Sequence, residues 1–122
     1  MDQKQIIARM AEQRSRWVEV APGKQVRVLR PTEEDQPKFI ERRDGEVYWS
    51  CSFAQIKSVV DAWRGFTEAD LIEGGADDEV PFSPELWVAV VGDRVAYAAP
   101  VRTAVIELIS EHRHSLDSIE KN

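Results

Sequence analysis

Residues 17–30 read WVEVAPGKQVRVLR, and this stretch decides the fold. Apolar and polar side chains alternate before and after the Pro-Gly pair at 22–23, and this period of two is typical of β-strands. Two strands around a Pro-Gly turn predict a β-hairpin. Because an isolated hairpin is only marginally stable in water, it must bury one face, and the later helices are the candidates to cover it.

The C-terminal part of the chain predicts an amphipathic helix from about residue 100 to 114. The apolar stripe of this helix consists of residues at helical spacing, namely Val101, Ala104, Val105, Leu108, Ile109 and His112. Residues 1–15 contain helix formers and predict a second, N-terminal helix within 2–14. Residues 115–122 are polar, and we expect them to fray.

The middle of the chain predicts two more helices. Ser52 begins the first, in which Phe53, Ile56, Val59, Val60 and Trp63 recur at helical spacing before Gly65. A second helix, from about 84 to 91, starts at Ser83-Pro84-Glu85, and Gly92 is expected to end it. Residues 31–46 are expected to be irregular with one helical turn, and residues 47–49 to form a short third strand. Residues 67–80 are expected to form a loop, with room for a short turn at 67–70.

These elements predict a single α+β domain over residues 1–122, with an N-terminal hairpin or small antiparallel sheet packed against about three helices. The chain is 43% hydrophobic and 31% charged, which suits a folded domain. Charged side chains interrupt the first twenty residues, and no apolar run approaches the ~20 residues of a membrane span, so we expect neither a signal peptide nor a membrane partner. The single cysteine, Cys51, favours a reducing compartment such as the cytoplasm.

The net charge of −6 is unevenly distributed. Residues 1–30 have a net charge of +4, whereas residues 67–93 contain eight acidic side chains and no Lys or Arg. An acidic segment without compensating bases argues against nucleic acid as a partner. It is either a solvated loop or an acidic docking surface for a basic protein segment, and Asp77, Asp78 and Glu79 are the candidates for such contacts.

The sequence contains no recognisable catalytic, cofactor-binding or metal-binding constellation. His112 and His114 are two residues apart on a predicted helix, so they point to different faces and cannot share one metal ion. The acidic run at 77–79 lacks the spacing of a calcium-binding EF-hand loop. Cys51 is expected to be a small buried hydrophobe. A small hydrolase would need a pocket that holds Asp70, His112 and another acid together.

Four tryptophans, at positions 17, 49, 63 and 87, are many for so short a chain. Tryptophan is enriched at protein interfaces because it buries a large area at low entropic cost. The alternative is that most of them fill the core. We choose Trp87 as the first candidate for a partner-binding anchor, Trp17 as the second, and Phe82 as a further candidate beside Trp87.

Two segments carry a resemblance to a known family. Residues 59–71 read VVDAWRGFTEADL, and residues 80–87 read VPFSPELW after an acidic gap that contains two glycines. Together with VRVLRPT at 26–32 and the C-terminal helix, they resemble the tail assembly chaperones of long-tailed bacteriophages and prophages. The likeness covers residues 24–112.

This resemblance implies a non-enzymatic protein of the host cytoplasm that coats apolar helical stretches of the tape measure protein until tail subunits polymerise around it. The implied partners are the tape measure protein and, as a second candidate, the major tail protein, with no cofactor; self-association into a homo-oligomer stays open. The alternative function is a virion structural protein of the head–tail connector or tail terminator type, which forms a stable oligomer.

Overall fold

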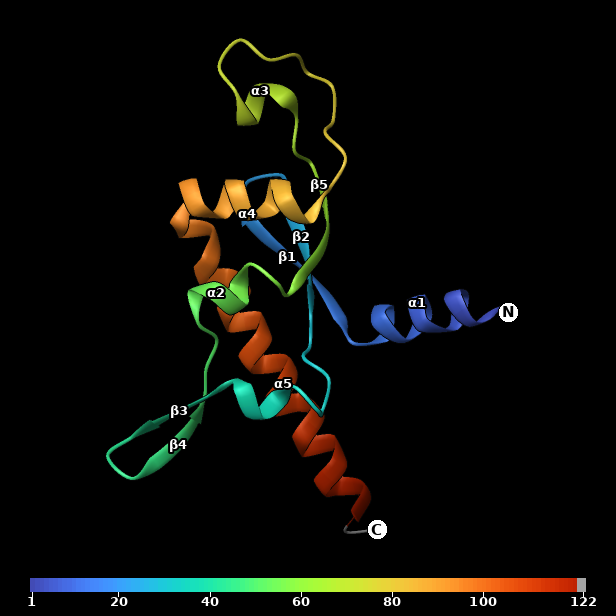
Figure 1. Ribbon diagram of the computed structural model, residues 1–122, viewed down its shortest axis with the longest axis vertical. Helices are drawn as coiled ribbons and strands as arrows, with labels where there is room; N and C mark the ends of the chain where they lie inside the picture. The colour runs from blue at the N-terminus through green and yellow to red at the C-terminus, as the bar shows by residue number, and fades with distance from the viewer. Residues whose placement is uncertain (121–122) are drawn as a thin grey trace.

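A computed structural model describes residues 1–120. Within that range the chain forms a three-stranded antiparallel sheet, a separate two-stranded sheet and five α-helices (Figure 1). The elements in chain order are α1 (Gln3–Gln13), β1 (Ser15–Ala21), β2 (Lys24–Leu29), the 3-10 turn η1 (Gln36–Lys38), β3 (Ile40–Arg43), β4 (Glu46–Trp49), α2 (Phe53–Ile56), β5 (Val60–Arg64), α3 (Glu68–Leu71), α4 (Pro84–Asp93), the 3-10 turn η2 (Val95–Tyr97) and α5 (Ala98–Glu120). The predicted α+β class is confirmed.

The predicted hairpin is formed by β1 and β2, which pair antiparallel with Val18 opposite Val26. Its turn contains Gly23, whose φ of 75° is a conformation that glycine adopts without steric cost. Val26 and Val28 are fully buried, because this face of the sheet packs against the long helix α5 (Figure 1). The hairpin therefore buries one face against a helix, as its sequence pattern requires.

The predicted helix over residues 53–63 is wrong beyond its first turn. Helix α2 begins after the Ser52 cap but ends at Ile56, and Val60–Arg64 form strand β5, which pairs antiparallel with β2. The pairing contains a β-bulge, in which Asp61 is the extra residue on β5. Because of this extra residue, Val60 and Trp63 face the same side of the sheet although they are three positions apart, which imitates helical spacing.

The segment expected to be irregular contains a second hairpin. The expected helical turn is η1, but Ile40–Arg43 then form β3 and pair with β4. Asp44 and Gly45 both have positive φ angles, 51° and 80°, as a two-residue hairpin turn requires. The predicted strand at 47–49 is thus part of β4, and it belongs to a two-stranded sheet that projects from the body (Figure 1).

The two C-terminal helices begin close to their predicted positions. Helix α4 starts at Pro84, where the Ser83 hydroxyl accepts a hydrogen bond from the Leu86 N–H (3.1 Å), and it continues through Gly92 to Asp93. Helix α5 extends beyond the predicted end at about residue 114. Residues 115–120, which we expected to fray, continue this helix, and residues 121–122 of that expected tail lie outside the described residues.

The core lies between the three-stranded sheet, α2, α4 and α5. Its fully buried side chains include Trp87, Phe66, Ile56, Ile109, Val26, Val28, Val91, Val101 and Val105. The alternation of β2 and the apolar stripe of α5 both contribute to this set, so the two clearest sequence patterns meet in one core. Among residues 1–120, no helix has the length and apolar character that crossing a membrane requires.

Candidate functional site

Trp87, the first candidate for an exposed anchor, is a core residue. Its side chain is fully buried, and its indole N–H donates a hydrogen bond to the Ile56 carbonyl oxygen (3.1 Å). The prediction of an exposed anchor at this position is wrong. The reason is that α4 packs its Trp87 and Val91 side onto the sheet and α2, and the indole fills the space between them.

Trp17, the second candidate, lies on β1 and is 37% exposed. The Arg64 guanidinium stacks over its ring, 4.0 Å from the centroid, so a cation–π contact covers part of the indole. Phe82 is half-buried and packs edge-on against Trp63, with ring centroids 5.7 Å apart. Neither side chain is a fully exposed apolar anchor.

The acidic segment is an exposed loop with a closed base. Asp77, Asp78 and Glu79 are all exposed, but the Glu79 carboxylate accepts a hydrogen bond from the Gly65 N–H (2.8 Å) and helps to close the loop. The Asp78 carbonyl oxygen accepts another bond, from the Glu68 N–H (3.0 Å). Asp77 and Asp78 are therefore available for charge contacts, whereas Glu79 already has a structural role.

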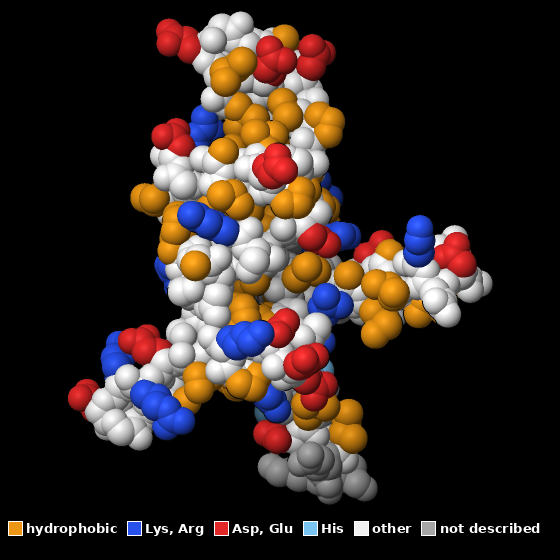
Figure 2. Space-filling model, in the orientation of Figure 1, with side chains coloured by type: hydrophobic (Ala, Val, Ile, Leu, Met, Phe, Trp, Pro, Cys, Tyr) orange, Lys and Arg blue, Asp and Glu red, His pale blue; other side chains and the backbone are white. Residues whose placement is uncertain are grey.

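The structure reveals an apolar groove between α3 and α4, which was not recognised from the sequence. It has a cavity volume of about 220 Å³. Its lining consists of Leu71, Ile72, Leu86, Ala89, Val90, Asp93 and Arg94. Figure 2 shows hydrophobic side chains gathered between these two helices, with acidic side chains beyond them at the same end of the molecule. We call this surface the α3–α4 groove.

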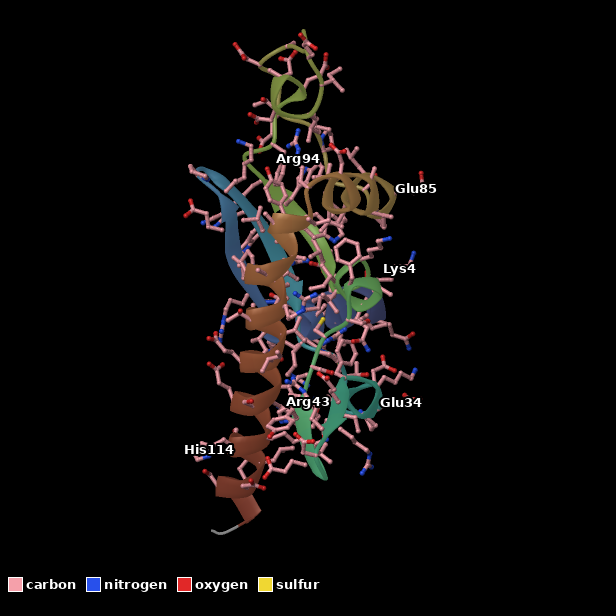
Figure 3. The ribbon with its side chains drawn as sticks, turned by 90° about the vertical axis from the view of Figure 1, so that its left-hand side faces the viewer. Lys4, Glu34, Arg43, Glu85, Arg94 and His114 are labelled. Carbon is pink, nitrogen blue, oxygen red and sulfur yellow. The ribbon has the colours of Figure 1, made fainter. Side chains whose placement is uncertain are left out.

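Side chains from three elements hold α3 in place beside α4. Asp70 and Thr67 form a reciprocal capping box at the start of α3, and Lys24 lies 3.2 Å from the Asp70 carboxylate. Arg94, at the end of α4, donates to the Asp70 carbonyl oxygen and faces the Tyr97 ring (Figure 3). These contacts join α3 to β2 and to the end of α4.

The hydrogen bonds at Asp70 also change its acidity. Its carboxylate accepts bonds from the Thr67 backbone N–H (2.9 Å) and hydroxyl (2.8 Å), and the nearby Lys24 adds a favourable charge. Together these partners lower the pKa of Asp70 below its usual value, the backbone bond being the largest cause. The folded protein therefore favours the ionised form of Asp70.

The groove lies in an acidic part of the chain. Asp93 lines it, and α3 and α4 both belong to residues 67–93, which contain eight acidic side chains and no Lys or Arg. The one basic side chain in the lining, Arg94, is engaged with the Asp70 carbonyl oxygen. An apolar groove within an acidic segment favours an apolar partner segment that has basic side chains on its flanks.

Helix α1 is a second uncovered apolar surface. It projects from the body (Figure 1), and none of its residues is buried. Ile6, Ile7 and Met10 are 46%, 65% and 57% exposed. These three residues lie on one face of the helix, and monomeric proteins seldom leave such a face without a partner.

The groups considered for chemistry lie apart from one another. Cys51 is buried, and burial raises the pKa of its thiol to about 11. His112 lies 3.3 Å from the Glu33 carboxylate, and His114 is exposed farther along α5. Among residues 1–120, no group of three or more His, Cys, Asp or Glu side chains is arranged to hold a metal ion.

Comparison of the chain with protein family models, with curated proteins and with solved structures finds no match.

Proposed function

We propose that this protein is a non-enzymatic assembly chaperone of the phage tail type. In the host cytoplasm it holds an apolar helical segment of the tape measure protein in the α3–α4 groove until tail subunits replace it. The observation that supports this proposal is the groove itself, which has an apolar lining with Asp93 in it and lies beside an α3 that is tied to Arg94 by a hydrogen bond. The resemblance of residues 59–71 and 80–87 to tail assembly chaperones supports the same role.

The dimensions of the groove suit reversible binding of a helix. A volume of about 220 Å³ accommodates one or two large apolar side chains, which an amphipathic helix presents at positions i and i+3 or i+4. A chaperone must release the segment that it protects, so each contact has to be modest. A shallow groove meets this requirement better than a deep pocket.

Capture of the tape measure protein tests the proposal. Ile72 lines the groove and is 57% exposed, whereas Val47 lies on the projecting β3–β4 hairpin and is 53% exposed. With a tape measure protein co-expressed, we expect Ile72→Ser to weaken its co-purification at least about tenfold, the effect of ~1.4 kcal/mol. The matched control, Val47→Ser, should capture as much as the unmodified chain. No capture by the unmodified chain, or equal capture by both variants, would contradict the proposal.

A virion structural protein is the second candidate function. The projecting helix α1 and the projecting β3–β4 hairpin favour it, because such arms are common in subunits of stable assemblies (Figure 1). Mass spectrometry of purified particles separates the two functions. A chaperone is absent from the finished particle, whereas a connector or terminator is present in a fixed number of copies.

A further inference from the structure

We infer that α1 of one copy of this protein binds in the α3–α4 groove of a second copy. The inference shares with the proposed function only the idea that the groove accepts a helix, and it does not depend on what the natural partner is. It joins the apolar face of α1 to the apolar lining of the groove.

The arrangement of charges on α1 fits the groove. At 100° per residue, Ile6, Ile7 and Met10 form one apolar face, and Lys4 and Arg9 fall on its two sides. The one acid of the helix, Glu12, falls on the opposite face. A basic residue therefore borders each side of the apolar face.

The groove presents the complementary pattern. Leu71, Ile72, Leu86, Ala89 and Val90 provide apolar contacts, and the acidic Asp93 lies in the same lining. The complementarity also holds on the larger scale, because residues 1–30 have a net charge of +4 and residues 67–93 a net charge of −8. Opposite charges around two apolar faces favour association and fix its orientation.

The orientation of α1 directs it toward another molecule. Its C-terminal end is fixed where Ser15 begins β1, because the Ser15 hydroxyl donates to the Glu12 carbonyl oxygen (2.7 Å) and the Arg14 side chain donates to the Arg30 carbonyl oxygen (3.2 Å). The groove lies toward the opposite end of β1, beside the hairpin turn, where Lys24 contacts Asp70. Figure 1 shows α1 pointing sideways, away from α3 and α4.

This contact is head-to-tail, since it joins two different surfaces. Repetition of such a contact makes a closed ring or an open row of subunits. In either case it covers the apolar face of α1 and the groove in the absence of the natural partner. A partner helix that enters the groove must displace α1, so self-association and partner binding compete.

Sedimentation velocity of the purified full-length chain tests the inference. We expect concentration-dependent association at micromolar concentration, which 0.5 M salt weakens because charge contacts contribute to it. The double variant Ile7→Ser/Met10→Ser removes most of the apolar face of α1, and Ile72→Ser makes the lining of the groove more polar. Each should weaken association at least about tenfold, the effect of ~1.4 kcal/mol, whereas Val47→Ser should not.

Mixing the two variants gives the decisive result. Each variant retains one functional surface, so an equal mixture should form a 1:1 dimer that does not grow further. A monomeric unmodified chain, association that neither variant weakens, or a mixture without dimers would overturn the inference. Circular dichroism should show unchanged folding of Ile7→Ser/Met10→Ser, because α1 contributes no buried residue.

Failure of this inference is distinguishable from failure of the proposed function. Ile7→Ser/Met10→Ser leaves the groove intact, so it should still capture the tape measure protein. Self-association without capture would contradict the proposed function alone, and capture without self-association would contradict this inference alone.

Discussion

Gly65 lies against the backbone of the β1–β2 turn. Its φ is 84°, and a Cβ at this position would stand 2.0 Å from the Gly23 carbonyl oxygen. Replacing Gly65 thus combines an unfavourable φ with a clash against backbone, whereas a Cβ on Gly23, at a φ of 75°, has nothing within 4 Å.

We predict that Gly65→Ala destabilises the protein by about 2–4 kcal/mol, because the β1–β2 turn must move away from the end of β5. Gly23→Ala should cost only about 1 kcal/mol, the effect of the φ angle alone. Urea unfolding of both variants measures the difference. Equal losses would mean that the close approach to Gly23 contributes nothing.

The lowered pKa of Asp70 predicts that the protein loses stability as the pH falls. Its pKa is lowered in the folded protein by its bonds to Thr67, so ionised Asp70 stabilises the fold above the pKa of the unfolded chain. This contribution is lost as the pH falls through the folded pKa, which lies below the usual aspartate value. Between pH ~5 and ~3 the unmodified chain should therefore lose more free energy of unfolding than Asp70→Asn. Asp77→Asn, at an exposed position in the same segment, controls for loss of one charge.

At the scale of elements, the structure differs most from the sequence pattern in β5. The strand places Asp61 beside Arg27 of β2, and the two side chains form a bidentate pair with both N–O distances at 2.7 Å. A helix over residues 53–63 would not be hydrogen-bonded to β2 in this register. A measured interaction between Arg27 and Asp61 therefore tests whether residues 60–64 form a strand that pairs with β2.

A double-mutant cycle with Arg27→Ala and Asp61→Ala should give a coupling free energy of about 1 kcal/mol, in the upper range for partly exposed pairs because the geometry is bidentate. The exposed pair Lys38–Asp35, at 3.2 Å, serves as the comparison and should give less than about 0.5 kcal/mol. Coupling near zero at Arg27–Asp61 would indicate that β5 does not pair with β2 in this register.

The sequence predicts those elements whose signals are local. The period of two around Pro22-Gly23, the cap at Ser83-Pro84 and the apolar stripe of α5 each lie within one element, and each is confirmed. Strand β5 was missed because its bulge gives apolar residues a spacing of three, the same as on a helix face. The pattern of apolar residues in one sequence is the same for a bulged strand and for a helix face.

The α3–α4 groove was missed for a different reason. It depends on contacts between distant parts of the chain, such as that of Arg94 with the Asp70 backbone 24 residues earlier, and no local pattern reports such a contact. The same limit explains Trp87, whose apolar face was recognised while its burial depended on where α2 and the sheet lie. In contrast, the acidic character of residues 67–93 follows from the amino-acid composition alone, because the net charge of a segment does not depend on how the chain folds.

In the molecule as a whole, the residues that form the core are not those of the projecting helix α1. Helix α1 buries none of its residues, whereas the core is built from the sheet, α2, α4 and α5. We predict that deletion of residues 1–13 changes the melting temperature by less than about 4 °C, corresponding to less than about 1 kcal/mol for a domain of this size. Differential scanning calorimetry at a low protein concentration, where self-association is negligible, checks this. A larger fall would show that α1 belongs to the cooperative unit.

The closed base of the acidic loop has a practical consequence. The Val80 N–H donates to the Phe66 carbonyl oxygen (2.8 Å), and the Trp63 indole N–H donates to the Val80 carbonyl oxygen (2.7 Å). These two bonds hold the first and last residues of the loop next to each other. Extra residues inserted at the exposed tip beside Gly74 lengthen a loop that is already closed, at an entropic cost that grows only logarithmically with length. A short fluorophore-bearing tag at this tip would then report occupancy of the neighbouring groove by its change in emission.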